Sequence, residues 1–469
     1  KLGDAPAKDE QLHPKTGDPK TFIGGGVSRD GKFQFVVIMR GWNENDVFFK
    51  RVGKDKTWQL LIDGKDAKYS VDSWKGQLYV FTDEGAPNKR VFKVDPNKFE
   101  RKNWKELIPE DKDASRESLV IVGGHFAIAS LKKAVSTVEL FTLEGKKVRD
   151  VELPGLGTSS NLVGDEDDDE AFFGFSSLTM PPQVFRTSVK SGKSEVYSKV
   201  DVPVDPSKFE VRQVFYPSKD GTSISMFIVA KKDVVLDGNN PVLLYGYGGF
   251  DVSLRSSFTS FIYPWLEAGG VYAMPNLRGG GEYGKAWHDA GKGAKKQNVF
   301  DDFHAAADYL IKEKWTNPKR LAIRGGSNGG LLVGVAMTQR PELFKAVVCS
   351  VPLLDMVRYH LYGSGKTWIP EYGDPEKPEE LKILEAYSPY SHIKAGAYPS
   401  LLMLSSDHDD RVDPFHARKF VAWTQAASPK SVSWLRIEAN AGHGGADQVA
   451  KAIENSSDQV AFLMDQLGL

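Results

Sequence analysis

A glycine-rich turn at residues 325–330 constrains the fold of this chain more than any other feature. The turn reads Gly-Gly-Ser-Asn-Gly-Gly, follows an apolar strand expected at 321–323 and precedes an apolar helix expected from Leu331. This is a G-x-S-x-G pattern between a strand and a helix. Such a turn strains the backbone of its serine and lifts the hydroxyl above the sheet, while the glycines let strand and helix pack closely. The alternative is a glycine-rich turn with an incidental serine.

The second half of the chain alternates apolar strands with helices. We expect a hairpin from residues 211–216 and 223–230, and one helix at 302–314 whose apolar residues recur at helical spacing. Buried strands that alternate with helices indicate a mostly parallel sheet with helices on both faces. The further expected strands are 242–245, 271–274, 321–323, 346–349, 401–404 and 432–437, and the further expected helices are 331–338, 414–426 and 447–467.

The first 205 residues instead read as short strands separated by turns. Without helical periodicity between them, such strands predict an all-β array. The repeating unit of roughly 40 to 50 residues suits propeller blades of four strands. The expected strands are 33–39, 77–81, 125–130, 137–142, 171–175 and 183–187, and the four candidate blades lie near 28–68, 69–110, 115–154 and 155–203.

Composition excludes several classes of protein. The 61 basic and 62 acidic residues give a net charge of −1, so we expect no nucleic-acid binding. The sequence contains no run of 18 apolar residues, so we expect no membrane span. The single cysteine, Cys349, can form neither an intrachain disulfide nor a cysteine-based zinc site, and its apolar surroundings predict a buried, inert thiol. We expect the acidic run at 165–170 to be a solvated loop rather than a calcium loop.

The serine of the turn, Ser327, needs a base to take its proton and a carboxylate to hold the tautomer of that base. In α/β-hydrolases the chain order is serine, carboxylate, histidine. Two later loops fit this order: 407–411 (Asp-His-Asp-Asp-Arg) and 442–445 (Gly-His-Gly-Gly). Both follow the carboxyl ends of expected strands, where open α/β sheets place their sites. The alternative for His443 is a surface histidine without a role. His408 and its neighbouring carboxylates lack metal-ligand spacing, so we expect no metal.

A developing oxyanion also needs hydrogen-bond donors. The loop 245–250 (Tyr-Gly-Tyr-Gly-Gly-Phe) follows an expected strand at the position where hydrolases supply one donor. The other donor would be the backbone N–H of Asn328, the residue after the serine. The alternative for the loop is a tight aromatic turn.

Five motifs together resemble the prolyl oligopeptidase family of serine peptidases. The likeness covers essentially all of residues 205–469, whereas in 1–205 it rests on architecture and weak local similarity. The motifs are Gly-Gly-Ser327-Asn-Gly-Gly, Tyr-Gly-Tyr247-Gly-Gly-Phe250, Arg278-Gly-Gly-Gly-Glu-Tyr-Gly284, Asp-His-Asp409-Asp-Arg411-Val412 and Gly-His443-Gly.

The resemblance implies a role for each matching residue. Ser327 would be the nucleophile and His443 the general base. The family's triad aspartate matches Asp409 rather than its acidic neighbours. The hydroxyl of Tyr247 would act with the amide of Asn328 as the oxyanion hole.

The resemblance also implies a substrate pocket. Arg411 falls where the family binds a substrate carbonyl on the acyl side, and Trp368 falls where an indole stacks on the proline ring. Tyr372, Phe250 and Val412 would line the same region. Proline has a flat, apolar ring without an N–H, so its pocket needs an aromatic face and no charged anchor. The alternative for Trp368 is a tryptophan of the core.

From these features we expect an α/β-hydrolase peptidase domain at 206–469, preceded by a β-propeller domain at 1–205. Full members of the family carry a larger propeller and a segment ahead of it. We therefore expect the propeller to be partial in this chain, which begins at Lys1, and to be completed by a missing N-terminal segment or a second chain.

The function implied is that of a serine oligopeptidase which cleaves short peptides on the carboxyl side of proline through an acyl-enzyme. We expect no cofactor and a cytoplasmic location, with secretion or a periplasmic location left open. One alternative is a related peptidase with another S1 preference, or an esterase. The other is an inactive hydrolase that serves as a propeller-based binding module.

Overall fold

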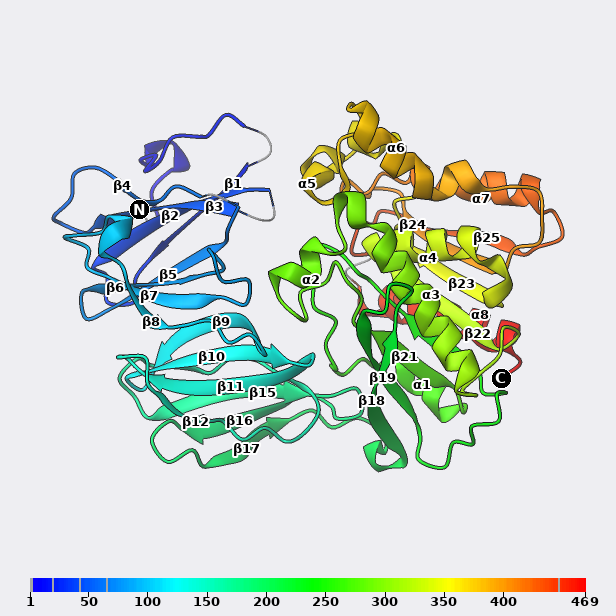
Figure 1. Ribbon diagram of the computed structural model, residues 1–469, viewed down its shortest axis with the longest axis horizontal. Coiled ribbons are helices and arrows are strands. Elements are labelled where there is room, and N and C mark those ends of the chain that lie inside the picture. Colours follow the sequence, from blue (N-terminus) through cyan, green and yellow to red (C-terminus); the bar gives the residue numbers. More distant parts are fainter. Residues whose placement is uncertain (1–2, 19–20, 42–43, 65, 446–447) are drawn as a thin grey trace. The chain divides into compact units, whose positions relative to one another are not determined.

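The computed structural model describes residues 3–18, 21–41, 44–64, 66–445 and 448–469 (Figure 1). The chain divides into two compact units, Lys1–Glu110 and Asp111–Leu469. Lys1, where we expected a missing part to join, lies outside the described residues. In the described ranges, no helix combines the length and the apolar character that crossing a bilayer requires.

Two antiparallel four-stranded sheets make up the first unit. Their inward side chains, such as Val47, Phe49, Leu78 and Val80, form one apolar cluster. Successive side chains of a strand point to opposite faces, so each sheet contributes one face to this cluster. The strands are β1 (Thr21–Val27), β2 (Phe33–Arg40), β3 (Glu44–Arg51) and β4 (Gln59–Ile62), then β5 (Tyr69–Trp74), β6 (Gln77–Thr82), β7 (Arg90–Val94) and β8 (Lys105–Ile108).

The second unit begins with two further antiparallel sheets. Three of the four sheets lie within stretches expected to be blades, whereas the first sheet begins earlier, because β1 precedes the expected start at residue 28. All six strands predicted in this half are present, as β2, β6, β10, β11, β15 and β16. The strands are β9 (Ser115–Val122), β10 (His125–Lys132), β11 (Val135–Thr142) and β12 (Lys147–Asp150), then β13 (Thr158–Ser159), β14 (Val163–Gly164), β15 (Glu170–Ser176), β16 (Gln183–Ser188) and β17 (Ser194–Lys199).

An eight-stranded sheet in the order β18-β19-β21-β20-β22-β23-β24-β25 organises the rest of the second unit. β18 and β19 form the predicted antiparallel hairpin, and the strands from β21 to β25 run parallel. Parallel strands bring their carboxyl ends, and the loops that follow them, to one edge. The strands are β18 (Phe209–Pro217), β19 (Ser223–Lys231), β20 (Val242–Tyr245), β21 (Val271–Pro275), β22 (Leu321–Gly326), β23 (Ala346–Ser350), β24 (Ser400–Ser406) and β25 (Ser433–Glu438).

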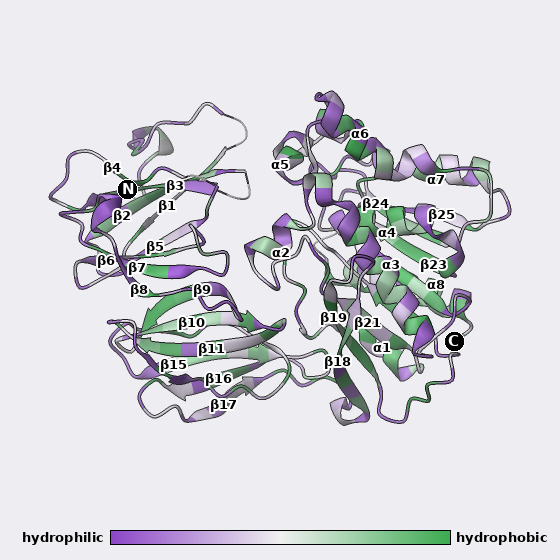
Figure 2. Cartoon of the chain, in the orientation of Figure 1, coloured by the Kyte–Doolittle hydropathy of each residue, from purple (hydrophilic) through white to green (hydrophobic). Residues whose placement is uncertain are grey.

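Helices cover both faces of this sheet. Buried residues of α3 (Gln297–Lys312), α4 (Asn328–Gln339) and α7 (Phe415–Ala427) share one core cluster, and those of α1 (Ile262–Glu267) and α8 (Val449–Leu467) share the other. The middle strands, buried on both faces, carry the hydrophobic colour in Figure 2.

The predicted helices are present with shifted ends. α3 begins at Gln297 rather than at 302, because buried Val299 and Phe300 extend its apolar stripe by one turn. The predicted start of the last helix, Asp447, lies outside the described residues, and α8 begins at Val449. The sequence did not predict α1, which has six residues, nor α2 (Lys285–Asp289), α5 (Ile369–Tyr372) and α6 (Pro378–Tyr387). α1, α2 and α5 are too short to show a helical period.

Cys349 lies fully buried on β23, as predicted. Burial raises the pKa of its thiol, so the thiolate that reacts with oxidants and metals is disfavoured.

A buried ion pair ties the motif at 278–284 to the sheet. The guanidinium of Arg278 donates to both carboxylate oxygens of Asp302 on α3, at 3.0 and 2.6 Å, and to Asp220 in the β18–β19 turn at 2.5 Å. The side chains of Arg278 and Asp302 are 5% and 0% exposed. This motif therefore joins three segments of the fold through one charged group.

Glu282, in the same motif, is a buried carboxyl group that forms no ion pair among the described residues. One oxygen accepts the Leu254 N–H at 2.7 Å, while the other has no hydrogen-bond partner within the described residues. Burial, which opposes the charged form, raises the pKa of Glu282 to about 8. The group is therefore protonated in the folded chain at pH values where it ionises in the unfolded chain.

We predict that Glu282→Gln stabilises the protein increasingly as the pH rises. Below pH 4.5 both forms of the wild-type chain bind the proton, so the variant has little effect. Between about 4.5 and 8 the wild type loses about 1.4 kcal/mol of unfolding free energy per pH unit from this group, a loss that the neutral amide avoids. Denaturant unfolding at several pH values measures this, with exposed Glu267→Gln as the control. A gain that does not vary with pH would contradict it.

Candidate active site

Ser327 occupies a strained turn between β22 and α4. Its φ is 56° and its ψ is −118°, a conformation that L-residues rarely adopt. The turn is possible because its neighbours lack side chains: a Cβ on Gly325 would lie 2.0 Å from the carbonyl oxygen of Gly329. The Ser327 N–H donates to the carbonyl of Ser350 at 2.9 Å, which anchors the turn to β23. This is the local geometry that the glycine pattern predicted.

Asp409 and His443 form a buried hydrogen-bonded pair. Nδ1 of His443 lies 2.7 Å from Oδ2 of Asp409, and their side chains are 9% and 1% exposed. The other oxygen, Oδ1, accepts the N–H groups of Arg411 at 3.1 Å and Val412 at 2.9 Å. Because the carboxylate accepts, the ring carries its proton on Nδ1 and its lone pair on Nε2. The imidazole is thereby arranged as a base.

The neighbouring acidic residues have other surroundings. Asp407 pairs with the ring of His408 at 2.9 Å, and that ring is 68% exposed. Asp407 also accepts the N–H of Ala441 at 3.4 Å, in the loop that leads to His443. Asp410 is exposed. Of the three aspartates in this loop, Asp409 is the one that contacts His443.

The loop at 245–250 meets the serine turn. The side-chain amide of Asn328 donates to the carbonyl of Tyr247 at 2.6 Å, so this loop and the N-terminus of α4 are directly joined. Burial, reinforced by the negative charge of Glu371, raises the pKa of Tyr247 to about 12. The phenol therefore stays protonated, and able to donate a hydrogen bond, throughout the neutral range.

The three aromatic residues predicted for the pocket form a connected group together with Tyr359. The rings of Phe250 and Tyr372 meet edge to face with their centroids 5.5 Å apart. Tyr372 and Tyr359 also meet edge to face, with centroids 5.5 Å apart, and Tyr359 stacks with Trp368 at a centroid distance of 6.4 Å. Trp368 is 6% exposed and Val412 is 3% exposed, and both belong to the same core cluster. Tyr359 was not predicted, because it lies in the irregular segment after β23 and no pattern sets it apart.

Arg411 follows Asp409 on the same turn. Its side chain is exposed, while its carbonyl oxygen accepts the N–H of Ser364 at 3.2 Å. That contact ties the segment that leads to Trp368 to the Asp409 turn. Arg411 thus joins the pocket segment to the catalytic loop through its backbone and leaves its guanidinium available.

The structure thus brings together Asp409 with His443, Tyr247 with Asn328, and Tyr372 with Asn328, whose Oδ1 accepts the tyrosine hydroxyl at 2.9 Å. Within the described residues, the hydroxyl of Ser327 makes no hydrogen bond to His443. Catalytic hydrogen bonds in enzymes without substrate are often long and shorten when the substrate binds.

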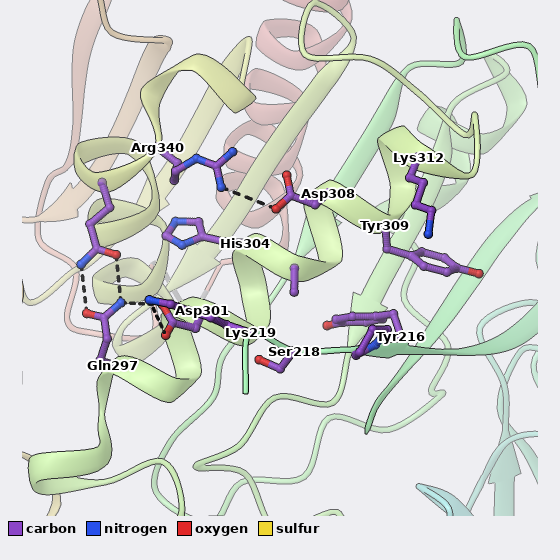
Figure 3. A pocket seen from close by; sticks show the side chains of 13 residues that line it. Tyr216, Ser218, Lys219, Gln297, Asp301, His304, Asp308, Tyr309, Lys312 and Arg340 are labelled. Atoms are coloured by element: carbon purple, nitrogen blue, oxygen red, sulfur yellow. Dashed lines mark hydrogen bonds and ion pairs between the residues drawn. The ribbon is translucent and has the colours of Figure 1, made fainter. Parts of the chain in front are cut away.

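A cavity of about 720 Å³ lies elsewhere, along α3 (Figure 3). Four of its charged side chains form two ion pairs, Arg340 with Asp308 at 3.5 Å and Lys219 with Asp301 at 3.6 Å. His304 lines it, and burial lowers the pKa of this ring to about 4, which keeps it neutral. None of the predicted site residues lines this cavity.

Comparison with known proteins identifies the family that the sequence motifs resemble. The model of the prolyl oligopeptidase family matches residues 256–469, and that of the prolyl oligopeptidase N-terminal β-propeller domain matches residues 1–200. The prolyl endopeptidase of Elizabethkingia meningoseptica is 39% identical over 473 residues, which cover 100% of this chain and 67% of that enzyme. The prolyl endopeptidase of Dictyostelium discoideum is 36% identical over 498 residues, with coverage of 100% and 65%.

Solved structures agree. A structure from a study of two prolyl endopeptidases superposes with a TM-score of 0.97 at 62% identity, over 100% of this chain and 69% of that one. Prolyl oligopeptidase B from Galerina marginata, bound to a 35mer substrate, superposes with a TM-score of 0.94 at 29% identity, over 100% and 68%. The chain therefore spans about two thirds of the length of these relatives.

These findings confirm the predicted fold class, an α/β-hydrolase domain preceded by a β-propeller domain. They give no support to a missing N-terminal segment or a second chain that would complete the propeller. With two family models and long matches above 30% identity, this chain belongs to the prolyl oligopeptidase family of serine peptidases.

Proposed function

We propose that this protein is a serine endopeptidase that hydrolyses short peptides on the carboxyl side of proline. The observation that carries the proposal is the buried hydrogen bond between Asp409 and His443, 2.7 Å long, in a chain whose strained turn presents Ser327. The names of the relatives, which are prolyl endopeptidases and prolyl oligopeptidases, support the proline specificity.

Catalysis would proceed through an acyl-enzyme. Oγ of Ser327 attacks the carbonyl carbon of the proline residue while Nε2 of His443 takes the hydroxyl proton. The C–N bond breaks as the imidazolium returns this proton to the leaving amine. Water then attacks the ester, His443 again accepts the proton, and Ser327 is regenerated as the carboxylic acid leaves. Asp409 holds the ring and stabilises the imidazolium in both halves.

Two donors would stabilise the oxyanion of each tetrahedral intermediate. These are the backbone N–H of Asn328, at the N-terminus of α4, and the hydroxyl of Tyr247. Preorganised donors of this kind stabilise the transition state more than the substrate. The hydrogen bond from the side-chain amide of Asn328 to the backbone carbonyl of Tyr247 holds the two residues next to each other, which supports their acting on the same atom.

The aromatic group supports a pocket for proline. Trp368 would stack on the ring, and Phe250, Tyr372 and Val412 would line the walls, while Arg411 would bind a substrate carbonyl on the acyl side. A preference for arginine or lysine would require a free carboxylate in the pocket. The carboxylate adjacent to Tyr372, that of Glu371, is 1% exposed and already bonded to His288 at 2.7 Å.

The proposal also includes the division of the chain into two domains and its location in the cell. We assign residues 1–205 to the propeller domain, which would admit peptides and exclude folded proteins, and residues 206–469 to the peptidase domain. In the structure β17 ends at Lys199 and β18 begins at Phe209. A cytoplasmic location stays a prediction.

We expect a fluorophosphonate probe to label the wild type but not Ser327→Ala. We also expect the wild type to cleave peptide substrates with proline at P1 faster than matched substrates with arginine or alanine. An unlabelled wild type would favour a binding module with an inactive hydrolase. Labelling with faster cleavage after arginine would retain the mechanism and refute the specificity.

Asp409→Asn should lower kcat by roughly a thousandfold or more with little change in KM, because the amide can favour the wrong tautomer of His443. Asp410→Asn, one residue away and exposed, is the matched control and should retain wild-type kinetics. Steady-state kinetics on a proline peptide measures both. Equal losses in the two variants would refute the assignment of Asp409.

Trp368→Ala should lower kcat/KM for proline peptides by about 1–3 kcal/mol of transition-state binding, the scale of pocket contacts. Trp423→Ala is the control, because that indole lies on α7 and is 49% exposed. Since Trp368 is itself 6% exposed, thermal melting of both variants should accompany the kinetics. A folded Trp368→Ala enzyme with unchanged kcat/KM would identify the residue as core packing.

A further inference from the structure

Three buried ionisable side chains lie behind the proposed site and have no part in the proposed chemistry. They are His288 on α2, Lys296 at the N-terminal end of α3 and Glu371 on α5, and they are 2%, 1% and 1% exposed. One carboxylate oxygen of Glu371 lies 2.7 Å from Nε2 of His288, and the other lies 3.6 Å from Nζ of Lys296. We call these three residues the buried charge cluster.

The buried charge cluster is bonded to the loop that carries Tyr247. Nζ of Lys296 donates to the carbonyl of Gly248 at 2.9 Å, and the N–H of Phe250 donates to Glu371 at 2.9 Å. The cation and the anion thus hold peptide groups on either side of Gly249. Both charged groups therefore form a hydrogen bond with the backbone of the same short loop.

That loop needs such support because its backbone is unfavourable on its own. Gly248 has a φ of 65° and Phe250 a φ of 57°. A bulky residue rarely adopts a positive φ, and such conformations persist only where the surroundings hold them. Gly248 adopts its positive φ without strain because it has no Cβ, so the strained residue of the two is Phe250, which the cluster holds through its N–H. The second hydrogen bond holds the loop at Gly248, two residues earlier.

The cluster also reaches the pocket and the serine turn. Nζ of Lys296 lies 5.4 Å from the ring centroid of Tyr372. The hydroxyl of Tyr372 donates to Oδ1 of Asn328 at 2.9 Å, and the side-chain Nδ2 of Asn328 donates to the backbone carbonyl of Tyr247 at 2.6 Å. These contacts connect the buried charge cluster, Tyr372 of the aromatic group, the serine turn and the Tyr247 loop in a closed ring.

Stability alone does not account for this cluster. Burial by itself would raise the pKa of Glu371, but the hydrogen bond from His288 and the charge of Lys296 outweigh it and lower the pKa. Burial lowers the pKa of Lys296 against the opposing effect of Glu371. Buried ion pairs often contribute less to stability than apolar side chains of the same volume. A group of this cost is better explained by the geometry that it imposes.

We propose that His288, Lys296 and Glu371 are positioning residues for the oxyanion hole. They hold the Tyr247 hydroxyl at the place where it acts together with the backbone N–H of Asn328. This inference rests on the proposed function, because it concerns the donors of that mechanism.

The first test is Lys296→Met, with Lys295→Met as the matched control because Lys295 is the adjacent lysine and is exposed. We expect kcat on a proline peptide to fall roughly tenfold to a hundredfold, with KM changed less than about threefold. The loss should stay below the roughly hundredfold to thousandfold loss on removal of a whole oxyanion donor. The control should match the wild type. A wild-type kcat in Lys296→Met would overturn the inference.

A double-mutant cycle with Tyr247→Phe separates positioning from a general structural role. If Lys296 acts through the Tyr247 hydroxyl, Lys296→Met should cost less than about a further threefold once that hydroxyl is absent. If the two losses in kcat instead multiply in full, Lys296 acts independently of Tyr247 and the inference is wrong.

Lys296→Met alone leaves Glu371 with one cation fewer and could unfold the chain. The double variant Lys296→Met/Glu371→Leu removes both charges and should fold, as judged by thermal melting, because apolar replacements of buried pairs are tolerated. We expect it to retain the kcat loss, since both bonds to the loop are gone. A folded double variant with wild-type kcat would overturn the inference. No turnover of proline peptides by the wild type would instead refute the proposed function.

Discussion

The register between β24 and β25 sets the distance on which the candidate site depends. The last paired residues of these strands are Ser406 and Glu438. The pairing continues beyond them, since the N–H of Asp407 donates to Glu438 at 3.1 Å. The two loops therefore leave the sheet side by side, and Asp409 and His443 meet within a few residues of it. A slip of one residue in a parallel pair would turn every side chain of one strand to the other face.

Backbone strain occurs at two positions of the proposed site. Ser327 at the turn after β22 and Phe250 in the loop after β20 both have a positive φ. The fold compensates differently in the two places. Ser327 is held by close packing of glycines and a bond to β23, whereas Phe250 is held by a buried carboxylate. Apolar packing suffices for a turn between two regular elements, but an irregular loop needs hydrogen-bonding partners for its peptide groups.

Local patterns in the sequence predicted the parts of the fold that have a period. All strands of the eight-stranded sheet and its long helices were predicted, because buried strands and amphipathic helices repeat their apolar residues regularly. The short helices α1, α2 and α5 were missed because they contain too few residues to show such a repeat. Resemblance to the family assigned Asp409 among three aspartates, a choice that spacing alone left open. In the structure, Asp409 is the one that contacts His443.

The buried charge cluster was beyond the reach of sequence patterns. Glu371 lies between Trp368 and Tyr372, which the resemblance placed in the pocket, but no pattern assigned a role to Glu371 itself. His288 and Lys296 belong to segments with no chemical signature. A lysine and a glutamate in a charged sequence predict solvent exposure, since these residues are seldom fully buried. What identifies them is their joint burial, and that depends on contacts between positions 83 and 75 residues apart, from 288 to 371 and from 296 to 371.

The same carboxylate affects both the geometry and the protonation of the proposed oxyanion donor. Glu371 accepts the N–H of Phe250 and so restrains the loop of Tyr247. Its negative charge adds to the effect of burial in raising the pKa of Tyr247, so the phenol is kept in the form that donates. An apolar residue at 371 would spare the cost of a buried charge, but it would supply neither the acceptor nor the field. For a hydroxyl that must be both fixed and protonated, one buried anion meets two requirements at once.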